Sequence, residues 1–351
     1  MTGLKVLQDS KKESHQSKIR SILAIAAGKG GVGKSSVAVN LALALKSQGF
    51  KVGLLDADIY GPSLEQMLPK GMAPAENPED LERLLPALAF GIPFISVAHF
   101  KKKASIVRAP IANQIIQQFL TIVDWGELDY LLIDFPPGTG DIQLTLMQKA
   151  KISAAVVVTT PQVVATLDVS KAVQLFQKME IPVLGVIENM SYLMQGEEKF
   201  FPFGSGGGEA LAKEFSFPLL GQIPIDPKIS EMGDHGESLF EKAPDSPGAK
   251  AFFAVLKKVL SEEKKVEKGE ISVRSGDVHH LEIEIEGNWR SISLHEIQKR
   301  CPCAGCESQK NCDKEVSLLE FSPVGRYALK ITFSSGCNKG IYPFALLKKI
   351  M

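Results

Sequence analysis

The stretch Gly28-Lys29-Gly30-Gly31-Val32-Gly33-Lys34-Ser35 decides the fold of this 351-residue chain. It has the glycine and lysine spacing of a phosphate-binding loop. An apolar run precedes it at 22–27, and an alanine-rich helical pattern follows at 36–46, which is the strand–loop–helix context that such a loop needs. The glycines let the backbone curl around an anion with its N–H groups inward, and the helix N-terminus points at the same place. The stretch therefore predicts a nucleotide site.

Each part of this loop has an expected role toward ATP and Mg²⁺. Lys34 would reach the β and γ phosphates, and the Ser35 hydroxyl would ligate Mg²⁺. Lys29 is a second cation near the start of the loop and indicates further charge neutralisation; a solvent-facing lysine at the loop mouth is the alternative. The residues of this segment that we expect to bind the nucleotide are Gly28, Lys29, Gly30, Gly31, Val32, Gly33, Lys34, Ser35 and Ser36.

Short apolar runs alternate with helical patterns from residue 22 to about residue 260. Runs that are apolar throughout are typical of a parallel sheet buried on both faces. They predict an α/β fold with a doubly wound, mostly parallel sheet and helices on both of its faces. The expected strands are 21–27, 52–56, 130–134, 154–159 and 183–187. Residues 70–86, rich in proline and charge, are expected to form an irregular excursion.

Composition divides the rest of the chain. Residues 1–18 are polar and predict a frayed tail, not a targeting peptide. Residues 261–270 are highly charged and predict a linker. An ATPase domain would then occupy residues 19–260. Residues 271–351 would form a small β-rich domain, in which the period-two alternation at 281–286 indicates a half-exposed strand.

Charge and cysteine usage exclude several classes of protein. Forty basic side chains balance forty acidic ones, so no bulk charge draws the chain toward nucleic acid or acidic lipid. No uninterrupted apolar run approaches membrane-spanning length. We therefore expect a soluble, cytoplasmic protein that neither binds nucleic acid nor associates stably with membranes. All five cysteines lie between Cys301 and Cys337, and in a reducing cytosol this clustering favours metal ligation over disulfides.

Aspartates follow two of the expected strands, at the edge where open α/β sheets place ligands. Asp58 comes just after the strand at 52–56 and is the candidate for orienting or activating the attacking water. Asp134 ends the strand at 130–134, as a Walker-B acid does, and could hold Mg²⁺ through a water. The turn-rich loop at 136–141 beside it could change shape on hydrolysis. Helix capping or loop hydrogen bonding is the alternative role for each aspartate.

Further motifs resemble the Mrp family, the ApbC-like ATPases that carry iron–sulfur clusters to apoproteins. The motifs, in the family's order, are DADIYGPS at 56–63, WGELDYLLIDFPPGTGDIQLTL at 125–146, ENMSY at 188–192 and GQIPIDP at 221–227. The wider class of deviant phosphate-loop ATPases, which the chain also resembles, implies a nucleotide-sandwich homodimer in which Lys29 crosses to the partner's nucleotide. The family resemblance implies that Asn189, Pro224 and Asp226 approach the adenine. An amide satisfied inside a loop is the alternative for Asn189.

The chain departs from this family in one respect. Family members usually carry a Cys-x-x-Cys shortly after the ENMSY motif, whereas residues 191–199 here read SYLMQGEEK. An iron–sulfur cluster needs thiolate or, occasionally, imidazole ligands. The usual cluster site is therefore expected to be absent from the ATPase domain.

A Cys-x-Cys-x2-Cys motif lies near the C-terminus, at Cys301, Cys303 and Cys306. In an extended segment residues two apart face the same side, so Cys301 and Cys303 can reach one metal, and Gly305 permits the turn that brings in Cys306. Cys337, on a hairpin-like connection, is the natural fourth ligand. Four thiolates suit zinc and equally a [4Fe–4S] cluster. Structural zinc, a transferable cluster and no metal all remain open.

This segment resembles the small domain found at the N-terminus of γ-butyrobetaine hydroxylases. The resemblance rests on the cysteine motif, on PVGRYAL at 323–329 and on GIYPF at 340–344. In that domain a histidine completes a zinc site, and Cys337 takes its place here, which makes the site softer and moves it toward iron–sulfur chemistry. Chloroplast scaffold proteins needed for [4Fe–4S] assembly combine the same two domains.

The sequence thus predicts a slow ATPase that serves as an iron–sulfur carrier or scaffold. In hydrolysis Lys29 and Lys34 would neutralise phosphate charge, Ser35 and Asp134 would hold magnesium, and Asp58 would act on the water. Its partners would be a second copy of the chain, apoprotein clients and assembly proteins. Two alternatives are a regulatory or partitioning ATPase of the ParA/MinD type, and an ATPase with a zinc-bound interaction module and no role in cluster transfer.

Overall fold

A computed structural model of the chain describes residues 18–103, 109–138, 140–196, 198–267, 273–285, 288–301, 316–324, 328–335 and 340–350. The described elements form a larger unit, which runs to Glu267, and a smaller C-terminal unit, which begins at Val273. Among these residues no apolar cluster combines side chains of both units. Each unit therefore has a core of its own.

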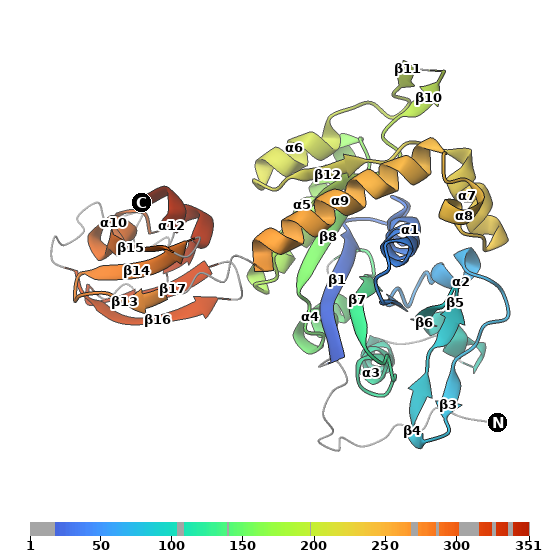
Figure 1. Cartoon of the computed structure of the whole chain (residues 1–351), viewed down its shortest axis with the longest axis horizontal. Helices are drawn as coiled ribbons and strands as arrows, with labels where there is room; N and C mark the ends of the chain where they lie inside the picture. Colours follow the sequence, from blue (N-terminus) through green and yellow to red (C-terminus); the bar gives the residue numbers. More distant parts are fainter. Residues whose placement is uncertain are drawn as a thin grey trace.

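An eight-stranded sheet organises the larger unit (Figure 1). Its order is β12-β9-β8-β1-β7-β2-β6-β5, and every neighbouring pair is parallel except β5 with β6. In this order the strands are β12 (Leu219–Gln222), β9 (Val183–Glu188), β8 (Ala154–Thr159), β1 (Ile19–Ala27), β7 (Leu128–Asp134), β2 (Val52–Asp56), β6 (Ile92–Ser96) and β5 (Ala87–Ala89). The predicted α/β fold with a mostly parallel sheet is confirmed.

Helices cover both faces of this sheet. Apolar side chains of α1, α2, α7, α8 and α9 pack on one face, and those of α3, α4, α5 and α6 pack on the other. The helices are α1 (Lys34–Ser47), α2 (Leu64–Met67), α3 (Ala109–Thr121), α4 (Asp141–Lys149), α5 (Val163–Lys178), α6 (Gly207–Glu214), α7 (Pro227–His235), α8 (Leu239–Lys242) and α9 (Pro247–Glu267), with a 3-10 helix η2 (Val97–Lys103) after β6. Because both faces are covered, the central strands are buried along nearly their whole length.

Residues 70–86 are not the irregular excursion that their proline and charge content predicted. They contain β3 (Ala75–Asn77) and β4 (Asp80–Leu85), which pair as an antiparallel hairpin. The Asn77 side chain accepts the N–H of Glu79 at 2.9 Å and so closes the turn. The backbone of Leu84 then bonds to that of Ile122 at 3.0 Å, which ties the hairpin to the chain beyond α3. Strands have formed here through tertiary pairing, although the local sequence has a weak strand propensity.

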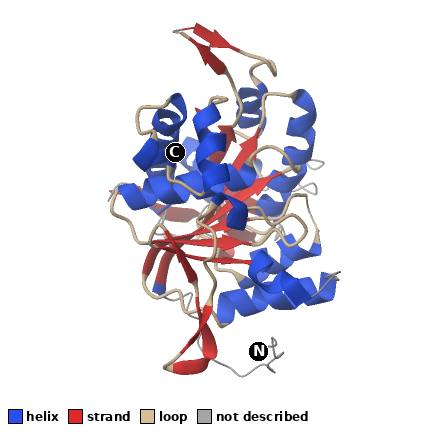
Figure 2. Cartoon of the chain, turned by 90° about the vertical axis from the view of Figure 1, so that its right-hand side faces the viewer, coloured by secondary structure: helices blue, strands red, loops and turns tan. Residues whose placement is uncertain are grey.

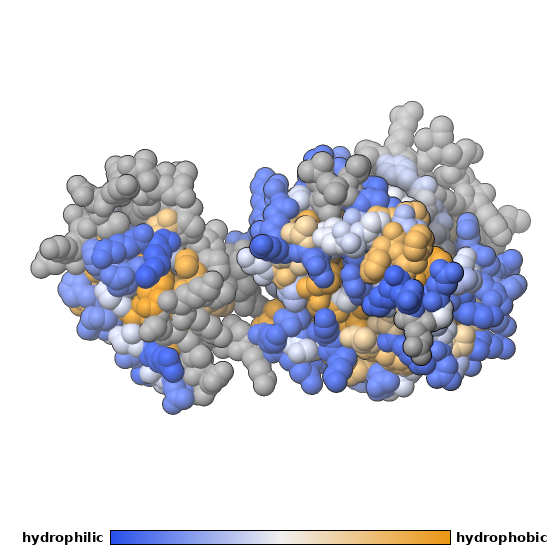
Figure 3. Space-filling view, turned by 90° about the horizontal axis from the view of Figure 1, so that it is seen from above, coloured by the Kyte–Doolittle hydropathy of each residue, from blue (hydrophilic) through white to orange (hydrophobic). Residues whose placement is uncertain are grey.

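Two hairpins stand at opposite ends of the larger unit in Figure 2. The lower one is β3–β4, and the upper one is formed by β10 (Leu193–Gln195) and β11 (Glu198–Phe200). Large apolar side chains are exposed on or just after the upper hairpin, at Phe200, Phe201 and Phe203. Figure 3, which looks down on the molecule from the α6 and α9 side, shows apolar areas between hydrophilic side chains. Contiguous exposed apolar areas are typical of contact surfaces.

The predicted linker at 261–270 is wrong for most of its length, because α9 continues to Glu267. Glu263 explains the helix. Its carboxylate is 4% exposed and accepts hydrogen bonds from Ser21 Oγ at 2.6 Å and from Tyr130 at 2.7 Å. Lys265 bonds to Glu262 one turn earlier, at 2.6 Å, on the exposed side of the same helix. The charged segment thus fastens the end of α9 to β1 and β7.

The C-terminal unit is β-rich, as predicted. It has two three-stranded antiparallel sheets, of order β13-β14-β15 and β16-β17-β18. Its elements are β13 (Val273–Ser275), β14 (His280–Ile285), β15 (Asn288–Ser293), α10 (Leu294–Lys299), β16 (Leu318–Val324), β17 (Ala328–Phe333), β18 (Gly340–Pro343) and α12 (Phe344–Ile350). One apolar core, which includes Leu281, Ile331 and Tyr342, joins the two sheets.

In the parts of the chain that the structure describes, no helix combines the length and the apolar character that a bilayer span requires.

Candidate nucleotide site

The loop from Gly28 to Gly33 joins β1 to α1 at the carboxyl edge of the sheet. Gly31 and Gly33 have φ values of 82° and 80°, a left-handed conformation that only glycine adopts without strain. A side chain at Gly28 would collide with the backbone of Asp168 and Val169 in α5. Around Gly30 and Gly31, by contrast, a Cβ would meet open space. The loop is therefore packed against α5 at its base and open at the turn where an anion would lie.

Lys34, Ser35 and Asp134 come together at this edge. Lys34 Nζ donates to Asp134 Oδ1 at 2.5 Å, and Ser35 Oγ donates to Asp134 Oδ2 at 2.5 Å. Asp134 is 0% exposed and Lys34 is 6% exposed. One buried carboxylate thus joins the two side chains of the loop for which phosphate and magnesium roles were predicted.

Asp58 lies on the other side of Lys34. Its Oδ2 is 3.8 Å from Lys34 Nζ, and its Oδ1 accepts the N–H of Gly61 at 3.1 Å. The second contact is the loop hydrogen bonding that was the alternative role for this residue. It occupies one carboxylate oxygen, and the other faces Lys34. The predicted role of Asp58 toward the attacking water stays a prediction.

Asp56 adds a carboxylate that the sequence did not single out. It stands opposite Asp134 in the pairing of β2 with β7 and is 0% exposed. Burial, with the charge of Asp134 as the next cause, raises the pKa of Asp56 to about 7. Burial also raises the pKa of Asp134, which Lys34 and Ser35 partly oppose. The site concentrates more negative charge than Lys34 alone balances.

This donor set fits a magnesium nucleotide. The open glycine turn offers backbone N–H groups to phosphate oxygens, and Lys34 supplies a cation beside it. Hydroxyl and carboxylate oxygens, as at Ser35 and Asp134, are the ligands that Mg²⁺ prefers. A divalent cation would also offset the charge shared by Asp56, Asp58 and Asp134.

Asn189 is bonded to the phosphate loop itself. Its Nδ2 donates to the carbonyl of Val32 at 2.9 Å, its own N–H donates to the carbonyl of Thr159, and its side chain is 7% exposed. The amide therefore braces the loop from the end of β9. This is the satisfied amide that was the alternative for Asn189, and its partner lies in the phosphate loop. The predicted contact of Asn189 with adenine stays a prediction.

Asp226 has a structural task that the sequence analysis did not consider. Oδ1 accepts the N–H of Lys228 at 2.9 Å, which caps α7, and Oδ2 accepts the N–H of Gly248 at 2.8 Å in the first turn of α9. Both oxygens are used at helix N-termini, where a carboxylate is favoured. Pro224 is buried in the same loop. Adenine contacts by Pro224 and Asp226 stay predictions.

Lys29 lies near the start of the loop and Ser36 lies in α1; both are half-buried. The Ser36 carbonyl accepts the Asn40 side chain at 2.9 Å inside α1. The position of Lys29, before the open turn, agrees with a role at a phosphate, and its reach to a partner's nucleotide stays a prediction.

Of the predicted metal ligands in the C-terminal unit, only Cys301 lies among the described residues; Cys303, Cys306 and Cys337 lie outside them. Cys301 is 7% exposed and belongs to the core of that unit. A Cβ built on Gly340 would come within 3.0 Å of the Cys301 sulfur. In the sequence, Gly340 follows Cys337 by three residues.

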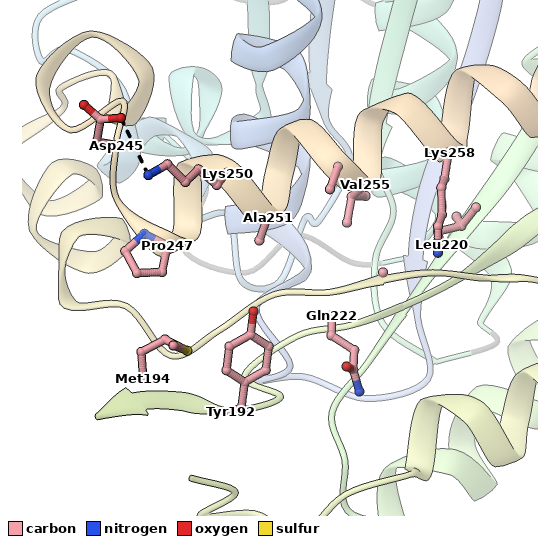
Figure 4. Close-up of a pocket in the computed structure, with 12 residues that line it drawn as sticks. Tyr192, Met194, Leu220, Gln222, Asp245, Pro247, Lys250, Ala251, Val255 and Lys258 are labelled. Atoms are coloured by element: carbon pink, nitrogen blue, oxygen red, sulfur yellow. Dashed lines mark ion pairs between the residues drawn. The ribbon is translucent and has the colours of Figure 1, made fainter. Parts of the chain in front are cut away.

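A pocket of about 400 Å³, which the sequence did not predict, lies between α9, the edge strand β12 and the segment that leads into β10 (Figure 4). Lys250 pairs with Asp245 at 3.6 Å at one end, and Lys258 donates to the Leu219 carbonyl at 3.2 Å at the other. No predicted site residue lines it. Its walls come from three separate segments of the sequence, so no local motif could have revealed it.

Comparison with known families assigns both units. Residues 18–260 match the profile of the NUBPL iron-transfer P-loop NTPases. The chain belongs to this family. Residues 273–348 match the N-terminal domain of γ-butyrobetaine hydroxylase-like proteins. Both predicted resemblances are confirmed, and the iron-transfer NTPase unit carries the site described above.

Two kinds of relative are similar to the chain. The chloroplastic Fe-S cluster assembly factor HCF101 of Oryza sativa subsp. japonica is 37% identical over 95% of this chain. The iron-sulfur cluster carrier protein of Deinococcus radiodurans is 44% identical over 73% of this chain and 71% of its own length. The chain spans 65% of the length of the rice factor.

Solved structures agree with this placement of the larger unit. A nucleotide-binding protein from Archaeoglobus fulgidus in complex with ADP is 38% identical, with a TM-score of 0.56, and the match covers 67% of this chain and 96% of that one. The cell-division ATPase MinD of Pyrococcus furiosus is 24% identical, with a TM-score of 0.51, over 69% of this chain and 99% of that one. The second likeness concerns the fold alone.

Proposed function

We propose that this protein binds and slowly hydrolyses ATP and, as a homodimer, carries iron–sulfur clusters to apoproteins. The observation that carries the proposal is the convergence of Lys34, Ser35, Asp58 and Asp134 at the phosphate loop of an iron-transfer NTPase. The names of the rice and Deinococcus relatives, a cluster assembly factor and a cluster carrier, support the second half. ATP, as opposed to another nucleotide, is part of the proposal.

The chain's own residues divide the work of hydrolysis. The loop N–H groups and Lys34 bind the phosphates, Ser35 and Asp134 hold Mg²⁺, and Asp58 orients the attacking water. Bound Mg²⁺ supplies a Lewis acid that offsets the charge of the phosphates. Lys34 gives up part of its contact with Asp134 when it binds phosphate, so binding redistributes charge among the three aspartates. We expect turnover to be slow, because the binding energy of the nucleotide is used to set the geometry of the dimer more than to accelerate the chemical step.

Lys29 would complete the site across a homodimer. It lies ahead of the open glycine turn and is half-buried in the single chain. A second cation supplied by the partner would stabilise charge on the transferred phosphate, as an arginine finger does in other NTPases. Dimerisation would then control hydrolysis.

The cluster is the cargo in this proposal, and the C-terminal thiols are its candidate ligands. Cys301 lies in the core beside Gly340, which follows Cys337 by three residues in the sequence, and Cys303 and Cys306 follow Cys301 closely in the sequence. Residues 191–199 contain no cysteine, so the ATPase unit offers no thiolate at the place where the family usually has two. Four thiolates would equally hold zinc, which would make the small unit an interaction module.

We place the protein in the cytoplasm.

Anaerobic reconstitution with iron and sulfide tests the cargo. The intact chain should gain iron, sulfide and the absorbance of a cluster. A Cys301→Ser/Cys303→Ser variant should gain none of the three, because a cluster needs its thiolates. A Lys250→Ala variant, changed at the surface of the other unit, is the control. Zinc without iron in both preparations would leave an ATPase with a zinc module and would refute the carrier function.

A further inference from the structure

Ser96 is the last residue of β6, the strand that pairs with β2. Its buried hydroxyl contacts Asp56, at the end of β2 beside the candidate nucleotide site. Its side chain is 0% exposed, and its Oγ donates to Asp56 Oδ2 at 2.9 Å and accepts the N–H of Ala98 at 3.1 Å. The Ser96 N–H donates to His99 Nδ1 at 3.2 Å. Burial lowers the pKa of His99, which favours the neutral ring that can accept this bond. The hydroxyl is therefore held in one orientation.

Asp56 in turn binds the backbone of the loop that carries Asp58. Oδ1 of Asp56 accepts the N–H of Asp58 at 3.1 Å, and Oδ2 accepts the N–H of Leu64 at 3.4 Å. These two donors stand at the two ends of the loop 58–64. Inside the loop, Asp58 also binds the N–H of Gly61. The Asp56 carboxylate thus accepts hydrogen bonds from both ends of the loop 58–64 and fixes the direction of the Asp58 side chain.

The surroundings of Asp56 disfavour its charged form. Burial and the neighbouring charge of Asp134 both disfavour the Asp56 carboxylate, while Lys34, the cation that acts on it, already contacts Asp134 and Asp58. A buried carboxylate without a closely paired cation depends on hydrogen-bond donors. The Ser96 hydroxyl is the only side-chain donor that reaches Asp56 among the described residues, and the other two donors belong to the loop.

We propose that Ser96 and Asp56 are positioning residues for ATP hydrolysis, Ser96 by orienting Asp56 and Asp56 by clamping the loop 58–64 so that Asp58 faces Lys34. The inference rests on the proposed ATPase function and assigns it two further residues. Both act through Asp58 and not on the phosphates. Loss of the clamp is therefore expected to slow turnover while nucleotide binding, which depends on the glycine loop and Lys34, is retained.

Four variants test the clamp. Ser96→Ala removes the hydroxyl, and Ser96→Thr restores it. Asp56→Asn keeps the shape but replaces one acceptor oxygen with a donor. Ser21→Ala is the matched control, because Ser21 is also a buried serine, 2% exposed, that donates to a buried carboxylate, that of Glu263. Ser21 lies at the start of β1, away from the loop 58–64. For each variant kcat, the Kd for ADP and amide hydrogen exchange of residues 58–64 without nucleotide are measured.

Ser96→Ala and Asp56→Asn should lower kcat about tenfold, the usual effect of one hydrogen bond to a charged group, and change the Kd for ADP less than twofold. Exchange of the 58–64 amides should accelerate about tenfold in both variants, because two of these amides bond to Asp56. Ser96→Thr should recover most of the lost rate and protection. Ser21→Ala should change the stability of the protein but neither of these readouts.

An unchanged kcat in a folded Ser96→Ala protein would overturn the inference and leave the ATPase function standing. So would a loss of affinity as large as the loss of rate. If Ser96→Ala does not fold, Asp56→Asn decides by the same measures. If the wild-type protein binds but does not hydrolyse ATP, the proposed function fails, and hydrogen exchange alone then decides whether the clamp exists.

Discussion

Lys34 stands between two buried aspartates, Asp134 at 2.5 Å and Asp58 at 3.8 Å. The spacing of the phosphate loop predicted Lys34 and Ser35, and the end of an apolar strand predicted Asp134, because these signals are local in sequence. Asp56 and Ser96 were not predicted. Their importance comes from a hydrogen bond between residues forty positions apart, which no local pattern encodes.

Replacing Lys34 with alanine should weaken ADP binding about a hundredfold, since it removes the buried cation that faces the phosphates and leaves the aspartates to repel them. A titration with a fluorescent ADP analogue measures this change. Lys46→Ala, an exposed lysine in the last turn of the same helix, should bind normally. Equal affinity in the Lys34→Ala protein would move the nucleotide site elsewhere.

Asp56 should make stability depend on pH in a defined window. Its pKa is raised from 3.8 to about 7, so the folded state binds the proton more tightly than the unfolded state. The wild-type free energy of unfolding should therefore fall, relative to that of Asp56→Asn, by about 1.4 kcal/mol per pH unit between these two values and level off above them. Urea unfolding of both proteins at pH 5, 6 and 8 measures the difference. A constant difference would contradict the raised pKa.

At the scale of elements, the sequence predicted strands better than connections. The runs at 52–56 and 154–159 match β2 and β8 residue for residue, because a strand buried on both faces is apolar along its whole length. The β3–β4 hairpin and the end of α9 were missed, since charged and proline-rich segments lack that signal. Both depend on contacts with distant parts of the chain.

Glu263 should stabilise the larger unit although it lies in the segment that was predicted to be a linker. Glu263→Ala leaves the buried hydroxyls of Ser21 and Tyr130 without their acceptor and should cost about 2–4 kcal/mol of unfolding free energy. Glu262→Ala, which removes only the pair with Lys265, should cost less than about 0.5 kcal/mol. Chemical denaturation compares the two. Equal costs would mean that the end of α9 is not anchored.

Asp226→Ala separates capping from adenine binding. Loss of the caps of α7 and α9 should destabilise the protein by about 1–3 kcal/mol. If Asp226 acts only as a cap, the discrimination between ADP and GDP should be unchanged in the folded protein. Thermal unfolding and competition binding measure the two effects. A loss of base discrimination with unchanged stability would instead support the predicted adenine contact.

At the scale of the whole molecule, the described residues form two separate cores, with the candidate nucleotide site in the larger unit and Cys301 in the smaller one. Composition predicted this division, although it put the boundary too early. The proposed function requires that ATP binding at one unit changes how the thiols of the other release a cluster.

Cluster transfer tests this requirement most directly. The reconstituted protein is mixed with an apo-protein that accepts a [4Fe–4S] cluster, with and without MgATP, and the transfer rate is followed by absorbance. MgATP should change the rate for the wild-type protein and leave it unchanged for Lys34→Ala. A cluster that moves at the same rate with or without MgATP in both proteins would contradict an ATP-controlled carrier.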